Sequence, residues 1–532
     1  MSITPYARHT TWEGYDTIVV GSGMGGLSTA VLLARYGGQR VLVLEQHYEA
    51  GGFTHTFRRP GGFEWDVGVH YIGGVLRSDT FLARLWHQVT GGRVRWASLG
   101  PVYDRIVVGD RVVDLPAGRR AWLATLQRAF PQQAAAVERY AQAVRAAQRA
   151  GRGLFAARAL PRGLGWWGRG GRGWARQRTG PTLKRLGVTA PDLAAVLTAQ
   201  YGDYGLPPGQ SSFLMHALLV HHYWYGAAYP VGGAGVLARA AAHELARLGG
   251  AVVVRAAVER LLLDARGRVM GVRLRNGHEI RAPRVVSNAG FATTFLHLLP
   301  PDHPYRPRAQ AVVRRVGLSA GHLNLYVGLD RDARTLDLPP YNLWLHPTPD
   351  LDARWERAQA DPHADFPFVF LSSASARDPD AARRMPGRAT LQAIAPAAWA
   401  PFAAWASTRW QRRGPDYAAL KTALTQRLLE VVYRALPQVR GHVVHAELST
   451  PLSTAHFTGH PQGAIYGLAA TPARFTTPDL RPDTAIPGLY LTGVDIVTPG
   501  VAGALVSGLF TAAAVLRRRP RALLRLLRLD PT

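Results

Sequence analysis

One short glycine-rich segment constrains the fold of this chain more than any other feature. Residues 21–26 have the sequence GSGMGG, which matches the pattern G-x-G-x-x-G. An apolar segment at residues 15–20 precedes it and predicts a buried strand, and an apolar helix follows it and ends near Tyr36. Residues 40–45 predict a second strand. This strand–helix–strand unit is typical of a parallel α/β fold that binds a dinucleotide.

Each part of this segment has a physical role in such a site. Gly21 permits a tight turn, Gly23 lets the backbone approach a pyrophosphate, and Gly26 lets the helix pack close to the strand. The free N–H groups and the dipole at the start of the helix favour phosphates. Glu45, at the end of the second strand, can accept hydrogen bonds from a ribose diol. We therefore predict cofactor contacts at Gly21, Ser22, Gly23, Met24, Gly25, Gly26, Glu45 and Gln46.

Two further segments favour FAD over a nicotinamide cofactor. Gly51 and Gly52 follow Glu45 at a short spacing, and a second glycine pair there extends the cofactor contact in many flavoproteins. Near the C-terminus, a predicted strand at residues 489–492 leads into a second glycine-rich helix start. A carboxylate there can bind ribityl hydroxyls, and the helix start can face the flavin edge where charge develops on reduction. From this segment we predict cofactor contacts at Gly493, Asp495, Gly503 and Ala504.

Composition limits the other classes of site. The length of 532 residues suggests at least two domains. The formal net charge is +28, but arginine supplies nearly all of it, so we attribute the basicity to overall composition and expect no nucleic-acid partner. The chain has no cysteine, which excludes disulfides, thiolate nucleophiles and cysteine-bound metals. The histidines show no metal-ligand spacing, and we expect no metal site.

Several segments bear on a membrane. Residues 1–14 are polar and lack the apolar core of a signal peptide, and residues 496–516 contain too much glycine and alanine to predict a spanning helix. Two segments combine arginines with apolar side chains, residues 158–178 and the basic tail at 517–532. Such segments suit the headgroup layer of an anionic bilayer, although a solvated loop or a nucleic-acid contact has a similar composition. We predict peripheral attachment at the cytoplasmic face of a membrane, with Trp166, Trp167 and Trp174 as apolar anchors.

Longer segments carry a resemblance to a known family. Residues 45–74, 201–234, 285–290, 449–467 and 487–505 resemble, in order, the corresponding segments of retinol saturases. The wider flavoprotein family includes carotenoid cis–trans isomerases and phytoene desaturases. One departure is Phe53, which follows Gly52 where many relatives place an arginine; Arg58 or Arg59 could supply that charge instead.

The resemblance implies an α/β protein with a Rossmann-like FAD-binding domain of glutathione-reductase type and a discontinuous α+β substrate domain. The FAD domain would comprise residues 1–80, 230–300 and 480–516, and the substrate or membrane-associating domain residues 81–229 and 301–479, with a basic tail at 517–532. It also implies a backbone contact of Val258 with adenine and a contact at Asn288. The expected partners are a hydrophobic retinoid or carotenoid and an external electron donor or acceptor.

The catalytic candidates come from an alternating segment. In residues 63–71 the alternation places His70 on the same face as Gly68, where backbone and cofactor could approach each other. We therefore take His70 and Tyr71, at the end of this predicted strand, as catalytic candidates, although a histidine packed in the core is the commoner outcome. A second aromatic cluster predicts either a substrate tunnel or plain core packing; it comprises His216, His221, His222, Tyr223, Tyr225 and Tyr229.

The expected chemistry is saturation of a C=C bond in a polyene, with hydride from N5 of the reduced flavin and a proton from an acid or water. Two rivals use the same cofactor: cis–trans isomerisation without net redox change, and desaturation in the opposite direction. A third alternative belongs to another class, a membrane-binding flavoprotein without catalysis. The sequence does not separate these alternatives.

Overall fold

The structure is a computed structural model that describes residues 2–7, 12–160 and 169–517. Its central element is a six-stranded parallel sheet with the order β1-β11-β3-β2-β15-β21. The strands are β1 (Ile3–Pro5), β2 (Thr17–Val20), β3 (Val41–Leu44), β11 (Ala251–Val254), β15 (Val285–Ser287) and β21 (Leu489–Leu491). Every residue of β2, β3 and β15 is buried, as expected for a parallel sheet covered on both faces. The predicted α/β fold is confirmed.

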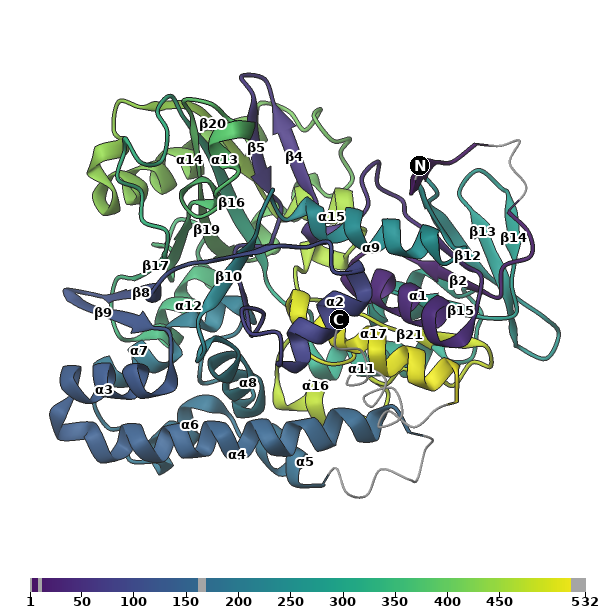
Figure 1. Ribbon diagram of the computed structural model, residues 1–532, viewed down its shortest axis with the longest axis horizontal. Coiled ribbons are helices and arrows are strands. Elements are labelled where there is room, and N and C mark those ends of the chain that lie inside the picture. Colours follow the sequence, from purple (N-terminus) through teal and green to yellow (C-terminus); the bar gives the residue numbers. More distant parts are fainter. Residues whose placement is uncertain (1, 8–11, 161–168, 518–532) are drawn as a thin grey trace.

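Helices from distant parts of the chain pack together beside this sheet (Figure 1). Helix α1 (Met24–Gly37) begins at the glycine-rich segment and contacts both α9 (Gly235–Arg247) and α17 (Val501–Val515), while α2 (Phe81–Thr90) lies against α9. Helix α17 is almost entirely buried, as predicted for its apolar sequence. Within the described ranges, no helix combines the length and apolar character needed to cross a bilayer.

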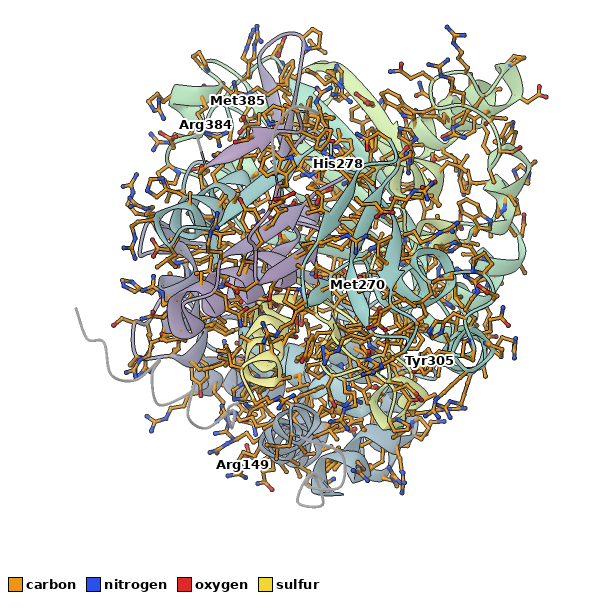
Figure 2. The ribbon with its side chains drawn as sticks, turned by 90° about the vertical axis from the view of Figure 1, so that its right-hand side faces the viewer. Arg149, Met270, His278, Tyr305, Arg384 and Met385 are labelled. Carbon is orange, nitrogen blue, oxygen red and sulfur yellow. The ribbon has the colours of Figure 1, made fainter. Side chains whose placement is uncertain are left out.

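A small antiparallel sheet lies beside the six-stranded one. Its strands are β12 (Val258–Leu263), β13 (Val269–Leu274) and β14 (Glu279–Arg281), and the predicted hairpin around Asn276 and Gly277 joins the last two. Figure 2 shows this side of the molecule, where Met270 and His278 are labelled. The start of β12 brings Val258 to the cavity described below.

A second large sheet has seven strands in the order β20-β16-β19-β18-β17-β8-β9. They are β8 (Val102–Val108), β9 (Arg111–Pro116), β16 (Gly321–Leu329), β17 (Asn342–His346), β18 (Val369–Ser372), β19 (Ala389–Ala397) and β20 (Val443–Ser449). Helices on this side of the molecule include α12 (Leu351–Ala360), α13 (Ala381–Arg384), α14 (Pro415–Ala435) and α15 (Pro451–Thr458). The described chain thus places one large sheet on each side of Figure 1.

A helical layer lies at the lower left and centre of Figure 1, below the seven-stranded sheet. Its long helix α4 contacts α5 and α8. The helices are α3 (Arg119–Ala129), α4 (Ala134–Arg158), α5 (Arg169–Arg176), α6 (Thr179–Arg185), α7 (Pro191–Thr198), the 3₁₀ helix η4 (Ala199–Asp203) and α8 (Phe213–Tyr223). The remaining α-helices of the described chain are α10 (Phe291–Thr293), α11 (Arg306–Val316) and α16 (Pro472–Thr476).

The prediction of one alternating strand through residues 63–71 is wrong. Strand β5 (Phe63–Asp66) pairs with β4 (Thr56–Arg59) and ends at Asp66. The chain re-enters a sheet only at β6 (Ile72–Gly73), which pairs with β10 (Ala227–Pro230); β10 also pairs with β7 (Trp96–Ser98).

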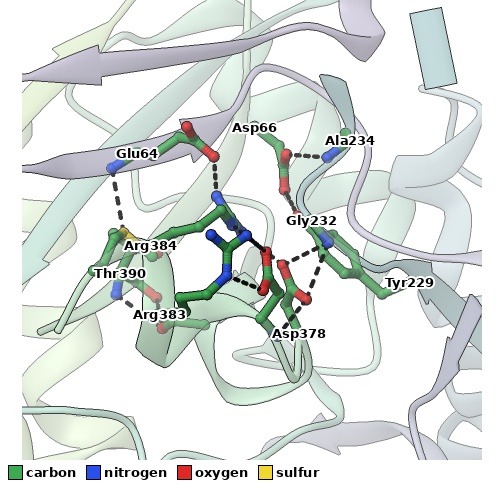
Figure 3. A network of polar contacts seen from close by, with 12 residues as sticks. Glu64, Asp66, Tyr229, Gly232, Ala234, Asp378, Arg383, Arg384 and Thr390 are labelled. Atoms are coloured by element: carbon green, nitrogen blue, oxygen red, sulfur yellow. Dashed lines mark hydrogen bonds and ion pairs between the residues drawn. The ribbon is translucent and has the colours of Figure 1, made fainter. Parts of the chain in front are cut away.

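The reason for this break is a buried polar network (Figure 3). The Asp66 carboxylate accepts hydrogen bonds from the Tyr229 hydroxyl and from the Ala234 N–H, at the start of α9. Beside it, Arg384 of α13 forms ion pairs with Glu64 and Asp378. Buried carboxylates are retained where such donors satisfy them, so the chain turns to keep these contacts. The network joins β5 to α9 and to α13.

The six-stranded sheet draws its strands from three separated stretches of the chain. This agrees with the discontinuous arrangement of the predicted FAD domain, although the boundaries 1–80, 230–300 and 480–516 stay a prediction, as do those of the substrate domain.

Candidate active site

A single cavity of about 1790 Å³ connects the glycine-rich turn to the helical layer. We call the part lined by residues 20, 21, 23–25, 44–49, 51, 52, 288–290 and 497–504 the cofactor half. We call the part lined by α4, α8, residues 202–205 and the strands β17 and β18 the substrate half. Exposed side chains line the cavity at Phe81 and Tyr225, and also at Tyr48 and Trp410, so it reaches the surface in both neighbourhoods.

The glycine-rich turn is packed too tightly for side chains. Gly21 has a φ of +95°, which favours glycine. A Cβ on Gly26 would lie 2.1 Å from the Gly21 carbonyl oxygen, and one on Gly25 would lie 2.6 Å from Cα of Gly493. A Cβ on Gly23 would meet only the side-chain amide of Asn288, at 2.8 Å. The close helix–strand packing predicted for Gly26 is therefore what the structure shows.

Glu45 and Ser22 fasten this turn to the following segment. One oxygen of the buried Glu45 carboxylate accepts hydrogen bonds from Ser22 N (2.8 Å) and Ser22 Oγ (2.7 Å), and the other accepts one from His47 N (2.9 Å). Ser22 Oγ also accepts a hydrogen bond from Gly51 N at 2.9 Å. These contacts hold Gly51 and Gly52 against the glycine-rich turn. A Cβ on Gly52 would lie 3.2 Å from Cα of Gly23.

Twelve of the sixteen predicted cofactor residues line the cavity. They are Gly21, Gly23, Met24, Gly25, Glu45, Gln46, Gly51, Gly52, Val258, Asn288, Gly503 and Ala504. The first residues of α1 and α17 both line it, and first-turn N–H groups have no partner within their own helix. Two positive helix ends beside backbone without side chains fit the phosphates and polar edges of a dinucleotide.

Four predicted residues, Ser22, Gly26, Gly493 and Asp495, are absent from the cavity wall among the described residues. Asp495 is buried, and its oxygens accept hydrogen bonds from Phe291 N (2.7 Å) and Leu468 N (2.9 Å). A guanidinium nitrogen of Arg474 lies 3.8 Å from one of them. Backbone N–H groups thus hold the Asp495 carboxylate behind the cavity wall, and its predicted contact with ribityl hydroxyls stays a prediction.

Both catalytic candidates line the cavity, together with Gly68. His70 packs edge-to-face on Phe370, and burial together with the Arg377 guanidinium lowers its pKa to about 3. The imidazole is therefore neutral near pH 7. Tyr71 stacks on Tyr223 with a ring separation of 4.3 Å, and burial raises the pKa of its hydroxyl well above its ordinary value. Neither side chain is a charged acid or base at neutral pH.

Aromatic rings dominate the substrate half. They come from the helices α4, α8 and α12, from loops and from the seven-stranded sheet, and include Phe155, Tyr223, Trp344, Trp355, Phe368, Phe370 and Tyr466. Of the second predicted cluster, His221, His222, Tyr223 and Tyr225 line the cavity. His216 and Tyr229 are buried elsewhere: His216 hydrogen-bonds Tyr140, and Tyr229 bonds Asp66. The tunnel and the core-packing interpretations thus each hold for part of the cluster.

The comparisons with known proteins agree with this architecture. The family model described as an NAD(P)-binding Rossmann-like domain matches residues 19–89. The human all-trans-retinol 13,14-reductase is 34% identical over 529 residues, which cover 95% of this chain and 86% of that protein. This chain belongs to the all-trans-retinol 13,14-reductase family. The family match covers both halves of the cavity, and the reductases are oxidoreductases.

Other members and relatives widen the range of activities. An inactive all-trans-retinol 13,14-reductase of Danio rerio is 31% identical over 96% of this chain and 87% of that protein. A prolycopene isomerase of an Oncidium hybrid is 26% identical over 92% of this chain and 81% of that protein.

Solved structures show the same fold at low sequence identity. An oxidoreductase from Methanosarcina mazei aligns with a TM-score of 0.62 at 15% identity, covering 94% of this chain and all of that chain. Cyclohexylamine oxidase from Brevibacterium oxydans aligns with a TM-score of 0.60 at 17% identity, covering 95% and 99%. At identities this low, the alignments show only that this chain shares the fold of those proteins.

Sequence reasoning missed a group of buried charges in the substrate half. Asp104 and Asp203 both contact Tyr71, and Arg377 donates hydrogen bonds to the His70 carbonyl oxygen and to Asn342. A signal existed for each carboxyl group. Asp104 stands between Tyr103 and Arg105 in a mostly apolar strand, and Asp203 lies inside the segment of residues 201–234 that carries the family resemblance.

Residues 158–178, which we predicted to form a basic membrane surface, are only partly exposed where the structure describes them. Trp174 packs against Phe213, and half-buried Arg158 donates hydrogen bonds to the carbonyl oxygens of Ile496 and Phe475. Both side chains thus contact the fold while remaining partly exposed, and the membrane contact of residues 158–178 stays a prediction. Arg172 is exposed on α5. Trp166, Trp167 and residues 518–532 lie outside the described residues.

Proposed function

We propose that the protein is an FAD-dependent oxidoreductase that saturates a C=C bond of a retinoid- or carotenoid-type polyene. The observation that supports this is the single cavity, whose glycine-built cofactor half continues without a break into an aromatic substrate half. A redox cofactor and a long conjugated molecule can meet in such a space. The family membership agrees with it, because the human relative is named for reduction of all-trans-retinol at carbons 13 and 14.

Backbone and helix ends would hold the cofactor. The turn around Gly23 and the start of α1 suit the pyrophosphate, Glu45 the ribose, Val258 the adenine and the start of α17 the flavin edge. When bound and reduced, FAD supplies a hydride from N5. Gln46, Asn288 and the Gly51–Gly52 pair complete the contacts that we propose.

The chain's own side chains would position the polyene. Tyr223 and Phe370, whose rings both stack with Tyr71, offer flat apolar surfaces for a conjugated chain. Neutral His70 can donate a hydrogen bond without placing a charge beside an apolar substrate. This wall orients the double bond and excludes water from it.

The test is the mass of the product. Reduced, cofactor-loaded protein is incubated separately with all-trans-retinol, a poly-cis carotenoid and phytoene. Saturation adds two hydrogens, isomerisation leaves the mass unchanged, and desaturation removes two hydrogens. We expect a gain of two hydrogens on a retinoid or carotenoid. An unchanged mass with an altered geometry supports the isomerase instead, which the likeness to prolycopene isomerase favours as the second candidate.

The alternative from another class is a membrane-binding protein without catalysis. The inactive relative of Danio rerio supports this alternative. Purified protein that shows no flavin absorbance, and releases no FAD on heating, would remove the enzyme hypothesis. Protein that is yellow but converts none of the three substrates would support the non-catalytic alternative.

We further propose peripheral attachment to an anionic membrane surface on the cytoplasmic side, and an external electron donor or acceptor. Support comes from the opening beside Phe81 and Tyr225, which are 39% and 51% exposed, with Arg84 and Arg152 on the same rim. Arg152 belongs to an exposed basic stripe on α4, which also includes Arg145 and Arg149. Arg149 is labelled in Figure 2. A polyene could enter here directly from lipid.

A further inference from the structure

Two carboxyl groups, one buried and one half-buried, share one tyrosine hydroxyl at the wall of the substrate half. Asp203, the last residue of η4, lines the cavity, whereas Asp104 on β8 is fully buried. The Tyr71 hydroxyl oxygen lies 3.0 Å from Oδ2 of Asp203 and 3.1 Å from Oδ2 of Asp104. The three groups form a chain of hydrogen bonds from Asp104 through Tyr71 to Asp203, which ends at the cavity.

This chain needs a proton on one of the carboxyl groups. A phenol has a single hydroxyl hydrogen, so Tyr71 can donate to only one of its two carboxyl neighbours. The other neighbour must donate its own hydrogen to the phenol oxygen to make a hydrogen bond. Two ionised carboxylates this close in a buried site would also repel each other. Both hydrogen bonds of the Tyr71 hydroxyl can therefore form when one carboxyl group is ionised and the other is neutral.

The surrounding donors select Asp104 as the ionised member. Its Oδ1 accepts a hydrogen bond from the Asn342 amide at 2.9 Å, and its Oδ2 accepts one from the Gln200 amide at 2.6 Å. Behind Asn342, the buried guanidinium of Arg377 donates to the amide oxygen at 2.8 Å and adds positive charge. Hydrogen bonds to a carboxylate favour its charged form. In the described chain, Tyr71 is the one hydrogen-bond contact of the Asp203 carboxyl group.

The electrostatic surroundings of Asp203 agree with a neutral carboxyl group. Burial and the nearby Asp104 raise the pKa of Asp203 well above its ordinary value. The other titratable groups around it are phenols, those of Tyr204, Tyr223 and Tyr466. Burial also raises the pKa of Asp104, to about 7, although its amide donors oppose that shift. Asp104 therefore ionises before Asp203.

The segment that follows Asp203 packs against the segment that precedes α17. A Cβ on Gly205, two residues later, would lie 3.2 Å from the ring of Tyr466. Tyr466 precedes Leu468, whose N–H is held by Asp495 just before the start of α17. The wall around Asp203 is thus continuous with the segment that leads to the proposed flavin-edge contact.

We propose that Asp203 is the acid that protonates the polyene, with Tyr71 and Asp104 as positioning residues. The inference rests on the proposed function. In the balanced step, one carbon of the double bond gains a hydride from the reduced flavin, and the adjacent carbon forms a C–H bond as the Asp203 O–H bond breaks. Asp203 is left as a carboxylate and regains a proton from water. The external donor supplies the two electrons for the next turnover.

The first experiment measures the protonation state without turnover. Infrared spectra of the cofactor-loaded protein at pH 7 are compared with those of Asp203→Asn, which conserves the shape of the side chain. We expect the carbonyl band of a protonated carboxyl group in the wild type and its loss in the variant. An exposed-site control, Asp361→Asn, should leave the band unchanged. A band that is unaltered in Asp203→Asn overturns the neutral carboxyl group, whatever the enzyme does.

The second experiment measures turnover. General acids contribute on the order of 100- to 10,000-fold, so saturation by Asp203→Asn should fall by about that factor while flavin content and polyene binding stay unchanged. Asp203→Glu should recover part of the rate, and the wild-type rate should decline as pH rises past the pKa of Asp203, a decline that the asparagine variant lacks. A variant that saturates within a few-fold of wild type overturns the acid role. If wild type saturates no polyene, the proposed function fails, and the acid role fails with it, while the infrared result still decides the protonation state.

Discussion

The two halves of the cavity are built by different means. The cofactor half is formed by glycines and by the first turns of α1 and α17, so its contacts come from backbone N–H groups and from the absence of side chains. The substrate half is formed by aromatic rings and by buried ionisable groups that hold one another through side-chain hydrogen bonds. The first surface is fixed once the backbone is fixed. The second depends on the protonation and packing of individual side chains.

The largest effect should come from a side chain placed on the bare backbone of the cofactor half. In Gly23→Val, the new Cβ meets only the Asn288 amide, which can rotate away, so the fold should survive. The valine would nevertheless occupy the space of the pyrophosphate, and we expect loss of flavin retention by at least about a hundredfold. The measurement is flavin absorbance per mole of purified protein. Gly173→Ala, a helical glycine with open space around it, is the matched control and should stay yellow.

This contrast explains what the sequence could predict. The glycine-rich turn, Glu45 and the α17 start are short contiguous segments whose backbone geometry is specified by residue type, and the structure places them together. The substrate half joins Tyr71 to Asp104 and Asp203 across 33 and 132 residues, which no local pattern encodes. Asp495 shows the limit within a recognised segment: its position predicts a carboxylate near the flavin, but only the fold reveals that backbone N–H groups already use both of its oxygens.

The second prediction tests Asp495, which holds the backbone at Phe291 and Leu468 behind the cavity wall. In Asp495→Asn, the amide nitrogen replaces one acceptor that now serves Phe291 N or Leu468 N, so one buried N–H group loses its partner. We expect the free energy of unfolding to fall by about 3 kcal/mol, since the lost hydrogen bond involves a charged group and the buried Arg474 loses a neighbouring charge. Denaturant unfolding of the cofactor-free protein measures it. A variant that is as stable as wild type but has lost its flavin would indicate that Asp495 contacts the cofactor directly.

The third prediction concerns His216, a buried histidine of α8 behind the wall of the substrate half. His216 is fully enclosed, its ring nitrogens contact the hydroxyls of Tyr140 and Tyr204, and burial lowers its pKa to about 3. Because the folded pKa lies below the unfolded value of 6.5, its contribution to stability is complete above pH 6.5 and is lost as pH falls toward 3. Between pH 7 and pH 5 the group should cost the wild type about 2 kcal/mol.

Chemical unfolding at several pH values measures this loss in wild type and in His216→Gln. The variant should show a shallower decline of stability between pH 7 and pH 5, whatever its stability at neutral pH. His363→Gln, at an exposed position, is the control and should follow the wild-type curve. Equal slopes for wild type and His216→Gln would show that the buried imidazole is not what makes this half sensitive to acid.

The smallest effect should appear at the rim, where the substrate half meets solvent. Phe81 and Tyr225 are exposed beside the opening, and each would gain from contact with lipid, while Arg84 and Arg152 would be attracted to anionic headgroups. In Phe81→Ser/Tyr225→Ser, partial loss of this burial should weaken binding to anionic vesicles by about tenfold, with flavin content unchanged. Flotation at two salt concentrations measures it, and higher salt should weaken both proteins. Val112→Ser on β9 removes an equally exposed apolar side chain away from the cavity, so it serves as the control. If the double variant and the control bind alike, the rim is not the docking surface, and attachment would have to be sought on residues of the basic tail.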